Sequence, residues 1–188
     1  RDRLRSRGLG DVYKRQVITP GREREIKQFE QIFRVNTLGT INALEAAKNC
    51  GTTRFIYVSS VAVYGTSSQE YDPVRETVPL KPSNVYEISK FASEHIALRY
   101  RELYNMDVRA IRLGDVFGAW EFDTGVRDTM SAPCQTLKAA LERRHAILPK
   151  EGMTGWVYVK DVAASITALA KACLLYTSDA ADDTPCVD

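Results

Sequence analysis

The chain has 188 residues, a length typical of one domain or of part of a larger protein. Its 26 basic and 24 acidic side chains give a net charge of +2, and this balance excludes a surface built for nucleic acid or anionic lipid. The sequence has no apolar run of about 18 residues or more, so it predicts no membrane-spanning segment.

The two ends of the chain differ from its middle. Residues 1–16 are rich in arginine and have no hydrophobic period. A DNA string that encodes Asp11–Gln16, once reverse-complemented and read one base later, encodes Cys173–Thr177 and the start of the next codon. Unrelated protein segments have no reason to be related in this way. We therefore interpret residues 1–16 and 173–188 as translations of a sequencing-library adapter, and residues 17–172 as the native domain.

The native part opens with a predicted helix. Apolar side chains recur at helical spacing from Glu23 to Asn49, and Asn49-Cys50-Gly51 is a typical helix stop. Arg54–Ser59 is rich in β-branched and aromatic residues, which predicts a strand buried on both faces. Thr66–Ser83 is polar and contains three prolines, so a loop is expected there.

The second half alternates helices with strands. A long helix is predicted from Asn84 to Tyr104, capped by Ser83 or Asn84, and a strand at Asp107–Leu113. An irregular stretch, a helix, a short strand and a last helix are then expected at Gly114–Ser131, Ala132–Arg144, Gly155–Val159 and Val162–Lys171. This alternation predicts an α/β fold with a parallel sheet, whose ligands bind at the carboxyl ends of the strands.

Tyr86 and Lys90 form the first candidate catalytic motif. Their four-residue spacing near the start of the long helix puts phenol and ammonium on one helix face. A phenol alone is a poor base at neutral pH, but a nearby cation favours the phenolate and makes it useful for proton transfer. Taken alone, the motif also fits a chance pair on a solvated helix face.

The second motif is Ser59-Ser-Val-Ala-Val-Tyr-Gly65, directly after the predicted buried strand. A hydroxyl at that place can hydrogen-bond the reacting oxygen of a substrate, and the alternative is a serine pair that ends the strand or caps a turn. The combination is more specific than either motif, because Tyr86 opens the next helix 26 residues after Ser60.

With these motifs the chain resembles the extended short-chain dehydrogenase/reductase family, the NAD-dependent epimerase/dehydratases typified by UDP-glucose 4-epimerase. The resemblance covers Gln28–Ala172 and rests on five blocks in the family's order: Val35–Thr40, Phe55–Gly65, Tyr86–Lys90, Ile111–Gly118 and Trp156–Val162. It implies a partial Rossmann-like, doubly wound parallel sheet with part of a small substrate-binding region.

The resemblance also implies roles for individual residues. Ser60, Tyr86 and Lys90 would be catalytic: Ser60 would bind and polarise the substrate oxygen, Tyr86 would be the acid/base, and Lys90 would hold the nicotinamide ribose. The implied cofactor site consists of Asn36, Ser59, Ser60, Tyr86, Lys90 and Gly114, and the implied substrate site of Ser60, Val61, Tyr86 and Asp115. No metal site is expected.

The cofactor implied is NAD or NADP, although the family's glycine-rich phosphate loop is absent from the sequence. We therefore expect a truncated fragment that begins after the first strands and is itself inactive. The implied partner is a small-molecule substrate, with no nucleic acid or membrane, and the full-length parent is expected to be a homodimer.

Two positions depart from patterns of the family. Sugar-nucleotide dehydratases carry an acidic pair where this chain has Val61 and Ala62, so we expect no elimination of water. Many nucleotide-sugar epimerases carry asparagine at the position of Asp115, and an aspartate there would repel a diphosphate. The leading hypothesis is an oxidoreductase or epimerase acting on a hydroxyl or carbonyl substrate. A non-catalytic nucleotide sensor of the same fold and a fragment without function are the alternatives.

For the remaining cysteine, histidine and aspartate candidates, the sequence favours structural roles. Cys50 and Cys134 lie in no metal or redox motif, so we expect free thiols in a reducing cytoplasm. His95 has no partner motif and is expected on a helix surface or in packing. Asp161 is expected to be a helix cap or a structural carboxylate.

Overall fold

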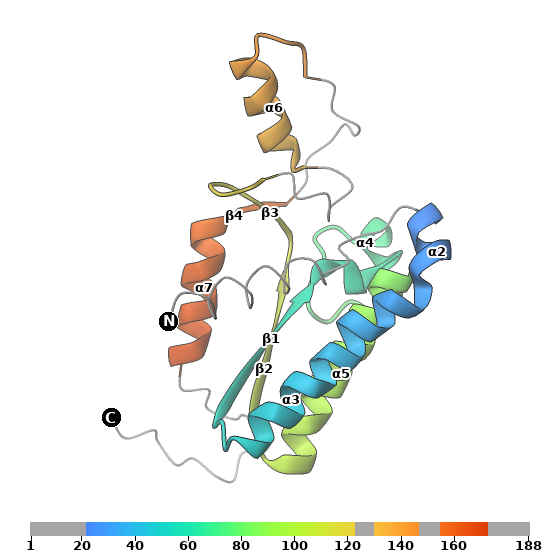
Figure 1. Ribbon diagram of the computed structural model, residues 1–188, viewed down its shortest axis with the longest axis vertical. Coiled ribbons are helices and arrows are strands. Elements are labelled where there is room, and N and C mark those ends of the chain that lie inside the picture. The colour runs from blue at the N-terminus through green and yellow to red at the C-terminus, as the bar shows by residue number, and fades with distance from the viewer. Residues whose placement is uncertain (1–21, 123–129, 147–154, 173–188) are drawn as a thin grey trace, which may run out of the picture.

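The computed structural model describes residues 22–122, 130–146 and 155–172, which Figure 1 shows in colour. The segments interpreted as adapter translations lie outside these ranges, as does part of the predicted irregular stretch. None of the described helices combines the length and the apolar character that a bilayer crossing requires.

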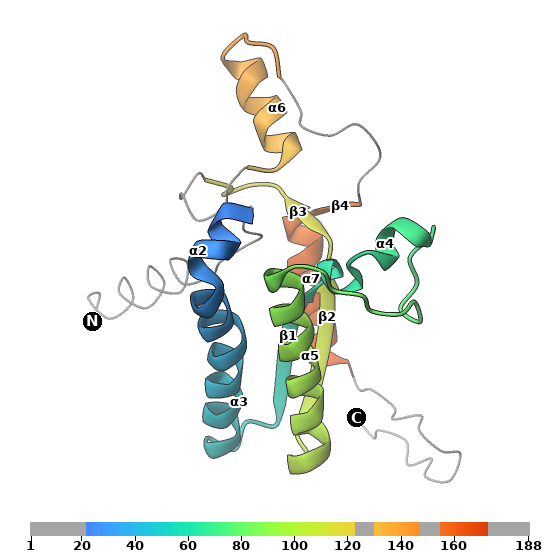
Figure 2. The same ribbon diagram turned by 90° about the vertical axis from the view of Figure 1, so that its right-hand side faces the viewer.

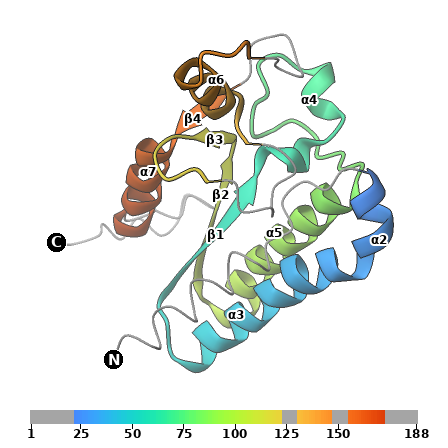
Figure 3. The ribbon, with the colours of Figure 1, turned by 45° about the horizontal axis from the view of Figure 1, so that its top comes forward.

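Two parallel strands form the centre of the fold. β1 (Arg54–Ser60) pairs with β2 (Asp107–Leu113), and the register runs from Arg54 opposite Asp107 to Ser60 opposite Leu113. The connection between them contains α5 (Val85–Tyr104), as parallel pairing requires a long crossover. Figures 2 and 3 show α3 (Gly39–Asn49) and α5 side by side on one face of the strands and α7 (Val159–Lys171) on the other. The predicted α/β fold with parallel pairing is confirmed.

The first predicted helix is present but is not a continuous α-helix. It consists of α2 (Arg22–Phe33), a π-helical turn η1 (Arg34–Leu38) and α3 (Gly39–Asn49). The wider turn closes with a hydrogen bond from the Gly39 amide to the Arg34 carbonyl. Such turns are rare and often occur at functional sites, and a helical hydrophobic period does not reveal them.

The start of α5 is fixed by a capping box. The Asn84 side chain accepts a hydrogen bond from the Glu87 amide at 2.9 Å, and the Glu87 carboxylate accepts one from the Asn84 amide at 3.3 Å. The helix ends before Asn105, which adopts a left-handed conformation with φ of 49°. The predicted cap and both ends of this helix are confirmed.

The prediction that β1 is buried on both faces, by contrast, is wrong for the described structure. Tyr57 and Ser59 are buried against the helices, but Val58 is 39% exposed and Phe55 and Ile56 are only partly buried. The physical reason is that β1 pairs only with β2 among the described residues, so its outer edge and part of one face are not covered.

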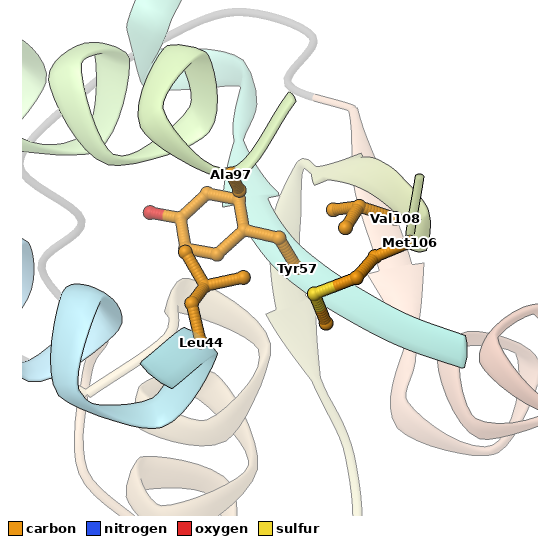
Figure 4. Packing of buried hydrophobic residues seen from close by; sticks show 5 residues of the cluster. All are labelled: Leu44, Tyr57, Ala97, Met106 and Val108. Carbon is orange, nitrogen blue, oxygen red and sulfur yellow. The ribbon is translucent and has the colours of Figure 1, made fainter. Parts of the chain in front are cut away.

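The main hydrophobic core lies between this pair of strands and the helices α3 and α5. Figure 4 shows its members: Leu44 from α3, Tyr57 from β1, Ala97 from α5, Met106 just before β2 and Val108 within it. Leu44 and Ala97 have no exposed surface at all. The core therefore holds both α3 and α5 against the strand pair.

The remaining elements differ from the predictions mainly at their ends. A short helix, η2 (Val61–Tyr64), follows β1, the predicted loop holds α4 (Ser67–Glu70), and the irregular stretch holds β3 (Asp115–Phe117). The others are α6 (Ala132–Leu141), β4 (Trp156–Tyr158), which pairs in parallel with β3, and α7 (Val159–Lys171).

Asp161 is not a helix cap. Helix α7 begins three residues earlier than predicted, with Tyr158 at the cap position, so that Asp161 lies inside the first turn. A carboxylate there still interacts favourably with the positive end of the helix dipole. His95 is exposed on α5 and stacks on Phe91 with ring centroids 4.2 Å apart, as expected of a surface or packing residue. Cys50 and Cys134 are free thiols.

Replacing Leu44 by alanine tests the position of the core. We expect Leu44→Ala to lower the free energy of unfolding by about 2–5 kcal/mol, because it leaves a cavity between α3 and the strands. Leu141→Ala on α6, where the side chain is 77% exposed, is the matched control and should change stability by less than about 0.5 kcal/mol. Urea denaturation followed by circular dichroism measures both. Equal losses in the two variants would contradict this assignment of the core.

Candidate active site

The carboxyl ends of β1 and β2 lie at the same edge of the sheet, because the strands are parallel and Ser60 is paired with Leu113. Gly114 follows directly after β2. A Cβ atom at Gly114 would lie 2.9 Å from the carbonyl oxygen of Gly155, so a larger residue would push the chain before β4 away. The chain therefore needs a glycine at this tip, whatever else Gly114 does.

The two serines at the end of β1 are held differently. Ser60 is extended, and its hydroxyl oxygen accepts a hydrogen bond from the Ala62 amide at 3.2 Å, so that it caps η2. The Ser59 hydroxyl is buried and has no partner at hydrogen-bonding geometry, although it lies close enough to the Glu94 carboxylate to help lower its pKa. The turn-cap interpretation of the serine pair thus holds for Ser60, and it leaves the hydroxyl proton of Ser60 available as a donor.

Lys90 reaches from α5 to the strand below it. Its ammonium donates a hydrogen bond to the Val58 carbonyl at 2.7 Å and lies 4.6 Å from the centroid of the Tyr57 ring. A cation over an aromatic face is attracted by the ring quadrupole. Burial lowers the pKa of Lys90 to about 8, and the negative charge of Glu94 offsets part of that effect.

Asn36 lies in the π-helical turn and connects it to the first turn of α5. Its side-chain amide donates to the Ser89 hydroxyl at 2.9 Å, and Ser89 donates to the Tyr86 carbonyl at 2.7 Å. The Asn36 carbonyl accepts hydrogen bonds from Thr40 at 2.6 Å and from Ser93 at 3.1 Å. The wider turn therefore has its polar groups satisfied by α5, which explains why it is stable there.

Two hollows flank the strand pair. The first, of about 1250 Å³, lies between β1 and the α2–α3 helix and is lined by Asn36, Tyr57, Val58 and Lys90 among others. The second, of about 1300 Å³, lies beside β2. Among the residues that line it are five of the predicted site residues: Ser60, Val61, Tyr86, Gly114 and Asp115.

The structure thus divides the predicted site into two groups. Ser60 and the half-buried Tyr86 share one hollow with the exposed Asp115, whereas Asn36 and Lys90 share the other. Ser59 is buried at the tip of β1. Among the described residues, no group of three or more metal-binding side chains is present.

A buried ion pair that the sequence patterns do not reveal lies beside this site. Glu94 of α5 is only 2% exposed and accepts hydrogen bonds from the guanidinium of Arg112 on β2. A charged residue on a predicted helix is ordinarily assigned to the solvent-facing side. The one signal in the sequence is the spacing, since Glu94 lies four residues after Lys90 and on the same helix face.

Comparison with known proteins identifies the family. The sequence profile of the NAD dependent epimerase/dehydratase family matches residues 12–174. The chain is 32% identical over 139 residues to a putative UDP-glucose 4-epimerase of Methanocaldococcus jannaschii, covering 72% of this chain and 44% of that protein. It is 38% identical over 98 residues to the mouse dTDP-D-glucose 4,6-dehydratase, covering 52% and 26%.

A solved structure gives the same result. The dTDP-glucose 4,6-dehydratase of Bacillus anthracis, in complex with NAD, superposes with a TM-score of 0.63 at 26% identity and covers 73% of this chain and 43% of that one. The chain spans less than half the length of each of these three proteins. It belongs to the NAD dependent epimerase/dehydratase family, and the predicted partial Rossmann-like fold is confirmed.

The pH dependence of stability tests the surroundings of Lys90. The unfolded chain, with a lysine pKa of 10.5, binds a proton up to a higher pH than the folded chain, in which the pKa of Lys90 is about 8. Stability should therefore rise as the pH increases from about 8 to about 10. Burial raises the pKa of Tyr57 to about 12, and a hydrogen bond to Glu45 does the same for Tyr100, so stability should fall again above pH 10.

Urea denaturation at a series of pH values measures this rise. It should disappear in Lys90→Met and persist in Lys160→Met, which changes an exposed lysine of α7. A rise of equal size in Lys90→Met would show that another group causes it.

Proposed function

We propose that this chain carries the catalytic part of an NAD(P)-dependent enzyme that oxidises or epimerises a hydroxyl-bearing carbon of a nucleotide sugar. Membership of the family supports an oxidoreductase or isomerase, and the relatives named above include a putative epimerase of UDP-glucose and dehydratases of dTDP-glucose. The observation that carries the proposal is the arrangement around the tip of β1, with Ser60 and Tyr86 on one hollow and Lys90 on the other.

In this proposal the second hollow receives the sugar. The Ser60 hydroxyl donates to the reacting oxygen, and the Tyr86 phenolate takes the proton from the substrate hydroxyl as its carbon is oxidised. The Lys90 ammonium favours the phenolate electrostatically, because an opposite charge nearby stabilises the ionised form. For epimerisation, Tyr86 returns the proton when the carbonyl is reduced from the other face.

The first hollow suits the nicotinamide end of the cofactor. Lys90 offers a charged donor for ribose hydroxyls, and Asn36 lies on the same hollow. A nicotinamide held there would supply the acceptor for the hydride of the substrate carbon and, in an epimerase, the donor that returns it. The other two predicted cofactor residues lie at the strand tips, where Ser59 is buried at the end of β1 and Gly114 lines the second hollow after β2.

The chain is not equipped for loss of water. Val61 and Ala62 follow Ser60 in η2, and Val61 is 43% exposed and lines the second hollow, so the side chain there offers no acid to a leaving hydroxyl. Asp115 lies exposed at the start of β3. Its charge favours contact with sugar hydroxyls over contact with a diphosphate.

Removing the Tyr86 hydroxyl tests the function. We expect Tyr86→Phe to lower kcat by about 100- to 10,000-fold, the usual range for loss of a general acid/base. The assay uses the complete protein that contains residues 17–172 together with a glycine-rich phosphate loop, and follows NADH absorbance or the epimeric product with UDP-glucose. Tyr104→Phe removes an equivalent hydroxyl at the far end of α5 and should leave kcat unchanged. Unchanged turnover in Tyr86→Phe would contradict the acid/base role of Tyr86, whereas NAD(P) binding without any turnover in the wild-type protein would favour the sensor hypothesis.

The absence of an acid in η2 gives a separate prediction. With dTDP-glucose or UDP-glucose and NAD, the complete protein should release no product lighter than the substrate by one water, as judged by mass spectrometry. An epimer has unchanged mass and an oxidised sugar has lost only hydrogen, so the three outcomes are distinct. Detection of the dehydrated sugar would refute the exclusion of elimination while leaving the role of Tyr86 intact.

A further inference from the structure

The Glu94–Arg112 ion pair joins the segments that carry the proposed site. The Arg112 Nε lies 3.1 Å from both carboxylate oxygens of Glu94, and a second guanidinium nitrogen lies 2.5 Å from Oε1. The third nitrogen donates to the Tyr64 hydroxyl at 2.9 Å, and the guanidinium stacks 5.0 Å from the centre of the Tyr64 ring. Each of the three guanidinium nitrogens therefore has a hydrogen-bond partner.

Burial makes the pair costly as a stabilising device. Glu94 is 2% exposed and the Arg112 side chain 22% exposed, so both groups have lost most of their hydration. Replacing such a pair by apolar side chains is often neutral or stabilising, whereas removing one partner is strongly destabilising. A gain in stability is therefore a weak reason for the pair to be present, and its position points to another.

The position is the junction of three parts of the site. Glu94 lies four residues after Lys90 and eight after Tyr86, on one face of α5. Arg112 lies two residues before Gly114 on β2, and Tyr64 ends η2, four residues after Ser60. A shift of α5 along the strands would break several of these hydrogen bonds at once.

Glu94 also acts on Lys90 through its negative charge, which raises the pKa of the ammonium against the larger effect of burial. The titratable and charged groups around the ammonium come from α5, from β1 and from the α2–η1 side of the first hollow: Tyr86, Glu94, Tyr57, Lys27, Glu30 and Arg34. Burial has the largest single effect and raises the pKa of Glu94, but the hydrogen bonds from Arg112, the Ser59 hydroxyl and the charge of Arg112 together outweigh it, so that the pKa is lowered and the carboxylate stays ionised.

We propose that Glu94, clamped by Arg112 and Tyr64, is a positioning residue that holds the Lys90 ammonium charged and keeps α5 in register with the tips of β1 and β2. The inference rests on the proposed function for its consequence in turnover, and on the ion pair alone for its consequence at Lys90.

The test compares two glutamates of the same helix. Glu94→Gln keeps the shape and removes the charge, and we expect the Lys90 side chain, followed by NMR, to titrate about one pH unit lower than in the wild-type chain. In the complete protein, the alkaline limb of the kcat profile should move to lower pH by the same amount. Glu102→Gln is the matched control, since Glu102 pairs with Arg99 on the exposed side of α5.

A second variant separates the effect on Lys90 from a loss of folding. Glu94→Gln combined with Arg112→Met leaves no unpaired buried charge, so its urea midpoint should recover while Lys90 still titrates at lower pH. Titration of Lys90 at the wild-type pH in both Glu94 variants would overturn the proposal and leave only a structural role. The NMR result does not depend on turnover, so failure of the proposed function, shown by an active Tyr86→Phe enzyme, is distinguishable from failure of this inference.

Discussion

The parallel pairing of β1 with β2 is the constraint on which the rest of the structure depends. Parallel strands cannot be joined by a tight turn, so the chain must leave the tip of β1, return along a helix and enter β2 from the opposite end. That helix is α5, and its first turns therefore lie beside both strand tips. Tyr86 and Lys90 belong to these turns, and the topology therefore brings Tyr86 to the same hollow as Ser60 and Lys90 to the Val58 carbonyl of β1.

The same topology creates an electrostatic problem. The Lys90 ammonium is carried into a partly buried position over the Tyr57 ring, where lost hydration favours the neutral amine. A carbonyl oxygen from Val58 and the charge of Glu94 compensate in part. Glu94 is itself buried and depends on Arg112 for its charge. Arg112 on β2 thus stabilises the charge of Glu94 on α5, and Glu94 in turn stabilises the charge of Lys90, which contacts β1.

Much of this arrangement could be predicted from the sequence, and the failures have physical causes. The bounds of β2 and the α5 cap follow from local patterns, because a β-branched run and an Asn84–Glu87 capping box act within a few residues. The π-helical turn at Asn36 does not follow from any local pattern, since the hydrogen bonds that stabilise it come from Ser89 and Ser93, far along the chain. The buried charge of Glu94 was missed for the same reason: its partner lies on another element.

The partition of the site into two hollows has a geometric consequence for the proposed reaction. A hydride passes only between carbons in contact, so in the proposed reaction the nicotinamide from the first hollow and the sugar from the second must meet at the carboxyl end of β1. The strand borders both hollows, since Tyr57 and Val58 line the first and Ser60 lines the second. Ser60 is small and uses its hydroxyl oxygen to accept from Ala62, so its hydroxyl proton remains a donor for the proposed substrate.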